Sequence, residues 1–138
     1  MAFESLVTGT VFIYPYLWHR QAQSGETEGR KNRPVAVTLR IGRVDGLETI
    51  IVIPITSKAT HADQLAVELP EIEKRRAGLD PNIRLWIVLD EANIDVVGKS
   101  YYLQDREPIG HLSKSFFVPI ARRFVAYFKS ANKVDRTR

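Results

Sequence analysis

The stretch that decides the fold runs from Gly29 to Lys58, and it begins Gly29-Arg-Lys-Asn-Arg-Pro-Val-Ala-Val-Thr-Leu-Arg40. After a turn it continues Thr49-Ile-Ile-Val-Ile-Pro-Ile-Thr-Ser-Lys58. Both halves are rich in β-branched residues, which favour strands. The Asp45-Gly46 pair between them is a strong hairpin signal, because glycine adopts a positive φ without steric penalty.

We expect these two strands to form an antiparallel hairpin, in which the start of the first lies beside the end of the second. Arg33 and Thr56 are then spatial neighbours. The inward-facing positions of both strands are expected to share one face of the hairpin: Val35, Val37, Leu39, Ile51, Ile53 and Ile55.

The composition indicates one globular domain spanning residues 1–138, with 44% hydrophobic and 26% charged residues. The absence of cysteine excludes disulfides and thiolate chemistry. The net charge of +4 favours a polyanionic partner, although it also suffices simply for solubility. No apolar run reaches the roughly 20 residues of a membrane span and no signal peptide is recognised, so we expect a cytoplasmic protein.

The rest of the chain adds short strands and two helical segments. Strands are expected at Thr10–Trp18, 64–69, 84–89 and 94–97, with a turn over 90–93 and a helical turn or two over 71–77. The polar stretch His19–Asn32 has no apolar period and is interpreted as a long mobile loop. These elements predict a β-rich α+β fold arranged as a mainly antiparallel barrel.

The segment from Ser113 to Pro119 is interpreted as the approach to a terminal helix, with Pro119 in the first turn of that helix, where the missing N–H is harmless. Residues 132–138 are interpreted as a frayed charged tail. The helix carries one apolar stripe made of Ile120, Ala121, Phe124, Val125 and Phe128.

Three short motifs occur in a characteristic order: Arg33-Pro-Val-Ala-Val37, Ile53-Pro-Ile-Thr-Ser57 and Gly110-His-Leu-Ser113. Together they resemble the MazF/PemK toxins, sequence-selective endoribonucleases of bacterial toxin–antitoxin pairs, over about Thr10 to Phe128. The resemblance implies an SH3-like antiparallel barrel of the MazF/PemK/CcdB type with a C-terminal helix. It also implies a homodimer, a bacterial cytoplasmic location and an acidic antitoxin as partner.

RNA cleavage without a metal requires stabilisation of charge on the phosphorane oxygens, a task that the planar guanidinium of arginine suits. The resemblance implies that Arg33 is the main catalytic group and that the Thr56 hydroxyl orients the scissile phosphate. Ser57 stands where the family often has a second threonine, and the resemblance makes it a secondary candidate that shares or replaces the role of Thr56. Asp90 and Asn93 are secondary candidates, because the matching segment of the family lines the active surface.

Basic and aromatic residues flank this site and suggest contacts with single-stranded RNA, whose bases are accessible for stacking. The expected RNA-binding residues are Arg30, Lys31, Lys58, Trp18 and His19, with Tyr14 and Tyr16 as further stacking surface. His19, His61 and His111 leave open an acid–base mechanism. Their spacing fits no helical metal motif, and the adjacent Asp90 and Glu91 would point to opposite sides of a strand, so no metal or cofactor is expected.

The sequence therefore favours a ribosome-independent, metal-independent endoribonuclease toxin that cuts single-stranded RNA and leaves a cyclic phosphate and a 5′-hydroxyl. The alternative is a non-catalytic binding module on the same barrel, either a CcdB-like gyrase poison or an inactive relative that binds RNA or an antitoxin. Arg33 and Thr56 favour cleavage, because a gyrase-binding surface has no need of a phosphate-directed arginine. The length of the His19–Asn32 segment departs from the family pattern.

Overall fold

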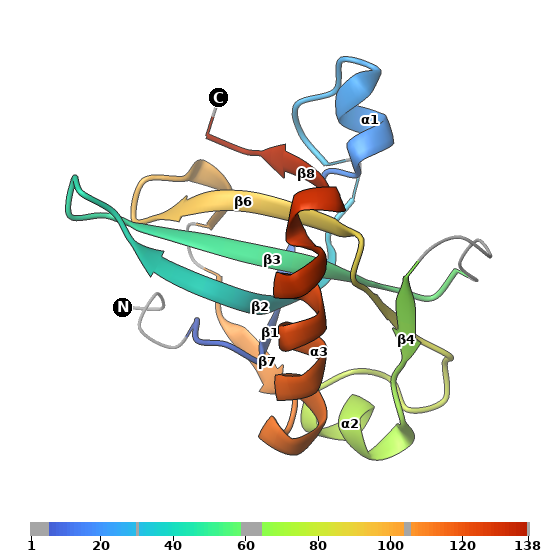
Figure 1. The fold of residues 1–138 in the computed structure, drawn as a ribbon. Helices are drawn as coiled ribbons and strands as arrows, with labels where there is room; N and C mark the ends of the chain where they lie inside the picture. Colours follow the sequence, from blue (N-terminus) through green and yellow to red (C-terminus); the bar gives the residue numbers. More distant parts are fainter. Residues whose placement is uncertain (1–5, 30, 59–64, 104–105, 138) are drawn as a thin grey trace.

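The computed structural model describes residues 6–29, 31–58, 65–103 and 106–137 (Figure 1). Within these residues the strands are β1 Thr10–Tyr14, β2 Arg33–Gly42, β3 Glu48–Thr56, β4 Ala66–Glu68, β5 Trp86–Val88, β6 Glu91–Val97, β7 Pro108–His111 and β8 Asn132–Asp135. The helices are α1 His19–Gln23, α2 Glu71–Arg76 and α3 Lys114–Tyr127, with short 3-10 turns η2 Tyr101–Leu103 and η3 Phe128–Ser130.

The eight described strands form one sheet in the order β4-β5-β3-β2-β1-β7, and β6 pairs with β3 and with β8. All pairs are antiparallel except β6 with β8. The prediction of a β-rich, mainly antiparallel fold with a late helix is confirmed. The described strands do not close into a barrel, because the two ends of the path, β4 and β7, do not pair with each other.

The hairpin of β2 and β3 is present, and Gly46 has a φ of 84° in its turn. The prediction that Val35 and Val37 share a face with Ile53 is wrong. Val37 pairs with Val52 and Ala36 pairs with Ile53, so Val35 and Val37 face one core while Ile53 faces the other. Because both faces of these strands are buried, the apolar run carries no alternation that could reveal the register.

The sheet therefore has a hydrophobic core on each face. Helix α3 crosses one face (Figure 1), where its residues Phe117, Ile120 and Phe124 pack onto β2 and β3. The other core is rich in aromatic residues and contains Phe12, Tyr14, Tyr16, Trp18, Val35, Val37, Ile50 and Val52. This second core underlies the candidate site.

Helix α3 begins after Ser113, whose Oγ accepts a hydrogen bond from the backbone N of Phe116 at 3.3 Å. Ser113 in turn donates its backbone N–H and its hydroxyl to the carboxylate of Glu73 in α2, at 2.9 and 2.7 Å. Pro119 lies inside the helix, so its predicted first-turn position is wrong. Val125 is 49% exposed and does not belong to the buried stripe.

Three segments are more ordered than the sequence suggests. The loop expected over residues 19–32 contains a helix, because His19–Gln23 forms α1. The charged tail contains β8, which pairs in parallel with β6, and Arg136 beyond it is buried. The expected turn over 90–93 is also wrong, because Glu91 already begins β6. Both strands are ordered by partners that are distant in the sequence, because β6 pairs with β3 and β8 pairs with β6.

Candidate functional site

The site begins where β2 starts and β3 ends. Val35 of β2 pairs with Pro54 of β3. The described pairing of the two strands ends there, and Arg33 and Thr56 each lie two residues beyond it, where Thr56 pairs with Trp86 of β5. Arg33 pairs with Tyr14 of β1, which holds its backbone in the sheet.

The guanidinium of Arg33 lies against aromatic and cationic neighbours. Its central carbon is 5.1 Å from the centre of the Trp18 ring, and that of Arg20 is 5.0 Å from the same ring. Burial and the charge of Arg20 lower the pKa of Arg33, and Tyr16 opposes them. The buried Nε of Arg33 has no hydrogen-bond partner in the described part of the chain. An anion placed near the two guanidinium groups would relieve the repulsion between them.

These groups surround a hollow of about 300 Å³, which we call the Arg33 pocket. This volume lies at the lower end of the range of small-molecule sites. Four of the described lining residues are cations and none is a carboxylate; the full lining is Tyr16, Trp18, Arg20, Gln21, Lys31, Arg33 and Lys58. The pocket is therefore suited to a phosphate or another anion.

Thr56 supports the pocket without lining it in the described structure. Its side chain is 7% exposed, and its Oγ1 accepts a hydrogen bond from the backbone N of Lys58 at 3.2 Å. This local turn presents Lys58 to the pocket. Ser57 is exposed between them. The hydroxyl of Thr56 thus shapes the basic turn that closes β3.

The expected RNA-binding residues fall into two groups. Lys31 and Lys58 are exposed and line the Arg33 pocket. Trp18 lines it too, but this ring is buried between other side chains and is not an open stacking surface. His19 begins α1 and is not among the described lining residues. Arg30 lies outside the described residues.

The two expected stacking tyrosines of β1 and its continuation are core residues. Tyr14 is fully buried and donates its hydroxyl to Asp95 at 2.6 Å. Tyr16 is 1% exposed, although part of it reaches the Arg33 pocket. Neither ring offers a free face to a base, so the prediction that they add stacking surface is wrong.

Asp90 and Asn93 make contacts within the scaffold. Asn93 is fully buried, and its amide accepts from the backbone N of Leu17 at 2.9 Å and donates to the carbonyl of Leu17 at 2.8 Å. Arg136 also donates to its Oδ1 at 3.0 Å. Asp90 accepts from the backbone N of Leu65 at 3.4 Å. In the described structure neither residue lines the Arg33 pocket.

The structure adds a residue that the sequence did not single out. Glu91 is 7% exposed, and its Oε1 accepts from the hydroxyl of Tyr16 at 2.9 Å and from the backbone N of His19 at 3.3 Å. Burial raises the pKa of Glu91 to about 7, although both hydrogen bonds and Arg20 oppose this. A carboxyl that titrates near neutral pH can act as a general base. It reaches the Arg33 pocket through Tyr16.

A signal for Glu91 was present in the sequence. Glu91, Asn93 and Asp95 alternate with apolar residues in β6, so their side chains share one face of the strand. All three are buried. Polar residues at alternate positions of a buried strand require partners, and here the partners come from β1 and the segment between β1 and α1.

The histidines do not form a catalytic pair in the described structure. His111 lies in β7 and is exposed, whereas His19 begins α1; His61 lies outside the described residues. No group of three metal-binding side chains is found in the part of the chain that the structure describes. Likewise, none of the described helices combines the length and apolar character needed to cross a membrane.

Comparison with protein-family models, with characterised proteins and with solved structures gives no match for this chain. What the site can do is therefore argued from its own chemistry.

Proposed function

We propose that this protein is an endoribonuclease toxin that cleaves single-stranded RNA by attack of a ribose 2′-hydroxyl, without a metal ion. The observation that carries the proposal is the Arg33 pocket, in which four cations converge and no described carboxylate lines the wall. The motifs around Arg33, Thr56 and Gly110 support the MazF/PemK type of toxin with its SH3-like topology.

In this mechanism Arg33 donates to the oxygens of the scissile phosphate and stabilises the charge that develops in the phosphorane. Arg20, Lys31 and Lys58 hold the neighbouring backbone of the RNA. The 2′-hydroxyl proton passes to the oxygen of Tyr16 as the Tyr16 proton passes to Glu91, along the hydrogen bond of 2.9 Å. Attack of the 2′-oxygen on phosphorus forms the cyclic phosphate and breaks the bond to the 5′-oxygen, which takes a proton from solvent water and leaves as a 5′-hydroxyl.

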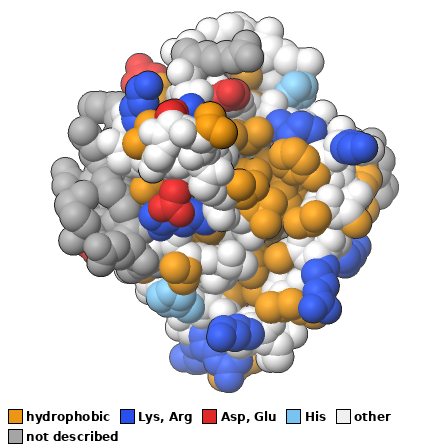
Figure 2. Space-filling model, turned by 60° about the vertical axis from the view of Figure 1, so that its left-hand side comes forward, with side chains coloured by type: hydrophobic (Ala, Val, Ile, Leu, Met, Phe, Trp, Pro, Cys, Tyr) orange, Lys and Arg blue, Asp and Glu red, His pale blue; other side chains and the backbone are white. Residues whose placement is uncertain are grey.

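The proposal includes a homodimer and an acidic antitoxin. Figure 2 shows a broad hydrophobic area bordered by Lys and Arg side chains on one face of the molecule. Exposed apolar side chains such as Ile41 and Val125, each 49% exposed, are of the kind that a second subunit covers. The cations of the Arg33 pocket suit an acidic segment of an antitoxin, which would block access of RNA.

The test is incubation of the purified protein with a long single-stranded RNA in EDTA, followed by mapping of the fragment ends. We expect discrete cuts from the wild type. Arg33→Ala should lower the cleavage rate by at least about 100-fold, as expected for one donor aimed at developing charge. Arg33→Lys keeps the charge but loses the paired donors, so it should restore only part of the rate.

The matched control is Arg122→Ala, which removes an exposed arginine of α3 and should leave cleavage unchanged. Circular dichroism checks that each variant is folded. Cleavage by Arg33→Ala at the wild-type rate would remove Arg33 from the mechanism. A folded wild-type protein that cuts none of several RNAs would favour the second candidate, a binding module, which the hydrophobic area of Figure 2 also suits.

A further inference from the structure

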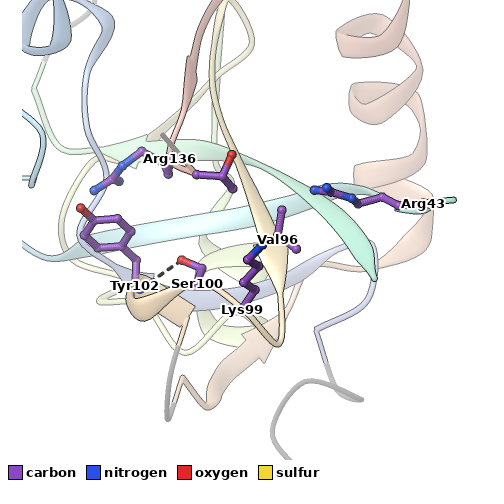
Figure 3. Close-up of a pocket in the computed structure, with 7 residues that line it drawn as sticks. Arg43, Val96, Lys99, Ser100, Tyr102 and Arg136 are labelled. Atoms are coloured by element: carbon purple, nitrogen blue, oxygen red, sulfur yellow. Dashed lines mark hydrogen bonds between the residues drawn. The ribbon is translucent and has the colours of Figure 1, made fainter. Parts of the chain in front are cut away.

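A second basic hollow lies at another part of the sheet. It has a volume of about 320 Å³ and is bordered by the turn after β2, by the β6–η2 connection and by the residues that follow β8. Figure 3 shows Arg43, Lys99 and Arg136 around it, together with Ser100 and Tyr102. We call it the Arg136 pocket. It shares none of its described lining residues with the Arg33 pocket.

Arg136 forms the inner wall of this pocket and is only 6% exposed. Its guanidinium donates to the carbonyls of Pro15 at 2.8 Å and Thr27 at 3.3 Å and to the side chain of Asn93 at 3.0 Å. All three acceptors are neutral, and Arg136 forms no ion pair with any described carboxylate. A buried charge without a counter-ion is unfavourable, so an anion in the pocket would stabilise it.

The position of Arg136 is fixed by aromatic rings as well. Its central carbon lies 3.9 Å from the centre of the Tyr102 ring and 5.5 Å from that of Tyr14. Figure 3 shows the guanidinium over the ring of Tyr102. The cation is therefore held in place in advance of ligand binding, which lowers the entropic cost of binding.

Lys99 and Arg43 supply two further cations from separate elements. Both are exposed. Arg43 contacts Asp45 at 2.9 Å in a pair that is open to solvent, and such pairs contribute little free energy. Arg43 can therefore exchange this partner for a ligand. Ser100 and Thr137 also line the wall, but their hydroxyls already donate to Asp95 and Asp135.

Three carboxylates lie near the pocket: Asp45 contacts Arg43, Asp135 accepts hydrogen bonds from Thr137, and Asp95 lies behind the wall. Asp95 is fully buried, and its Oδ2 accepts hydrogen bonds from Tyr14 at 2.6 Å and from Ser100 at 2.8 Å. It is not among the described residues that line the pocket. The three lining cations thus have three carboxylates nearby, and in the described structure only Asp45 forms an ion pair with one of them, Arg43, whereas Arg136 has neutral partners.

We propose that the Arg136 pocket binds the phosphate group of a nucleotide, with Arg43 and Lys99 contacting the phosphate oxygens and Arg136 providing the fixed positive charge behind them. Guanidinium and ammonium groups are the usual donors to phosphate in proteins. The phosphate can come from a free mononucleotide or from an RNA strand. The inference does not depend on cleavage at the Arg33 pocket.

The test is a titration of the ¹⁵N-labelled protein with adenosine 5′-monophosphate, followed by NMR of the backbone amides. We expect saturable shifts at Lys99, Ser100 and Thr137, and no such shifts with adenosine, which lacks the phosphate. Lys99→Gln should weaken binding at these amides by about fivefold, the size of one exposed charge contact. The Arg43→Gln/Lys99→Gln double variant should weaken it further than either single variant, and because both side chains contact the same phosphate the two effects need not add.

Lys31→Gln is the matched control, because it removes an exposed lysine from the Arg33 pocket instead. It should leave the shifts of Ser100 and Thr137 unchanged. The affinity of an oligoadenylate is measured from the shifts of the same amides. An affinity more than about tenfold higher than that of the mononucleotide identifies an RNA strand as the source of the phosphate, and equal affinity identifies a free nucleotide. Absence of saturable shifts, equal shifts with adenosine, or an unchanged affinity of Lys99→Gln would overturn the proposal. RNA cleavage by the same samples reports separately on the proposed function.

Discussion

Replacing Glu91 with glutamine tests the buried carboxyl beneath Tyr16, and the expected effect depends on pH. Burial raises the pKa of Glu91 from 4.5 to about 7. Because each pKa unit corresponds to about 1.36 kcal/mol, ionising this carboxyl costs about 3 kcal/mol more in the folded protein than in the unfolded chain. Glutamine keeps an oxygen for the Tyr16 hydroxyl and carries no charge.

The sign follows from proton binding. Between the unfolded pKa of 4.5 and the folded pKa of about 7, the folded protein holds the Glu91 proton and the unfolded chain has released it. The free energy of unfolding therefore falls as the pH rises through this window. Because glutamine does not titrate, the free energy of unfolding of the Glu91→Gln variant does not fall for this reason. Relative to the wild type it should gain about 2.5 kcal/mol of stability between pH 5 and pH 8.

The assay is urea unfolding of both proteins at pH 5 and pH 8, followed by circular dichroism. Glu68→Gln is the control, because Glu68 is exposed and its hydrogen bond from Arg84 holds its pKa below the ordinary value. Relative to the wild type, the Glu68→Gln variant should lose a small amount of stability as the pH rises, which is the opposite sign to the effect of Glu91→Gln. If the stability difference between Glu91→Gln and the wild type stays constant within about 0.5 kcal/mol from pH 5 to pH 8, the argument from burial is wrong.

Three further predictions concern single contacts. Ser113→Ala removes the cap of α3 and a partner of the Glu73 carboxylate, so we expect a loss of about 1–3 kcal/mol in urea unfolding; unchanged stability would contradict this role. Asn93→Leu leaves the backbone groups of Leu17 without partners and should lower the free energy of unfolding by about 3 kcal/mol; a value below about 1 kcal/mol would show that water replaces the amide. The Lys31→Gln/Lys58→Gln variant should reduce the slope of log affinity for single-stranded RNA against log salt by about 1.4; an unchanged slope would place the RNA elsewhere.

The sequence predicted those elements whose signals are local. The Asp45-Gly46 turn lies within the hairpin that it specifies, and the terminal helix has its apolar spacing within a few residues, although it begins at Lys114, earlier than the sequence placed it. The antiparallel hairpin also brings the start of β2 and the end of β3 to the same end of the sheet, with Val35 paired to Pro54. Local sequence signals therefore place Arg33 and Lys58 at one end of the hairpin, whereas the wall made by Tyr16, Trp18, Arg20 and Gln21 comes from a distant segment.

The parts that failed depend on contacts between distant residues. Arg136 donates a hydrogen bond to the carbonyl of Pro15, which lies 121 residues earlier in the chain. Glu91 accepts one from the hydroxyl of Tyr16, which lies 75 residues earlier. The charged segment that forms β8 contains a single valine and has no sequence pattern typical of a strand. It forms a strand because it pairs with β6. The assignment of faces in β2 failed for a related reason, because a strand that is buried on both sides has no polar alternation to read.

The polar stripe of β6 connects the two basic pockets. Glu91 supports the Arg33 pocket through Tyr16, Asn93 holds Arg136, and Asp95 accepts from Ser100 in the wall of the Arg136 pocket. Alternate residues of a strand are about 6.6 Å apart, so Glu91 and Asp95 are separated by about 13 Å. Two cationic hollows thus rest on one buried row of polar side chains. A substitution at the central Asn93 should consequently alter the Arg136 pocket directly, whereas it reaches the Arg33 pocket only through the backbone of Leu17.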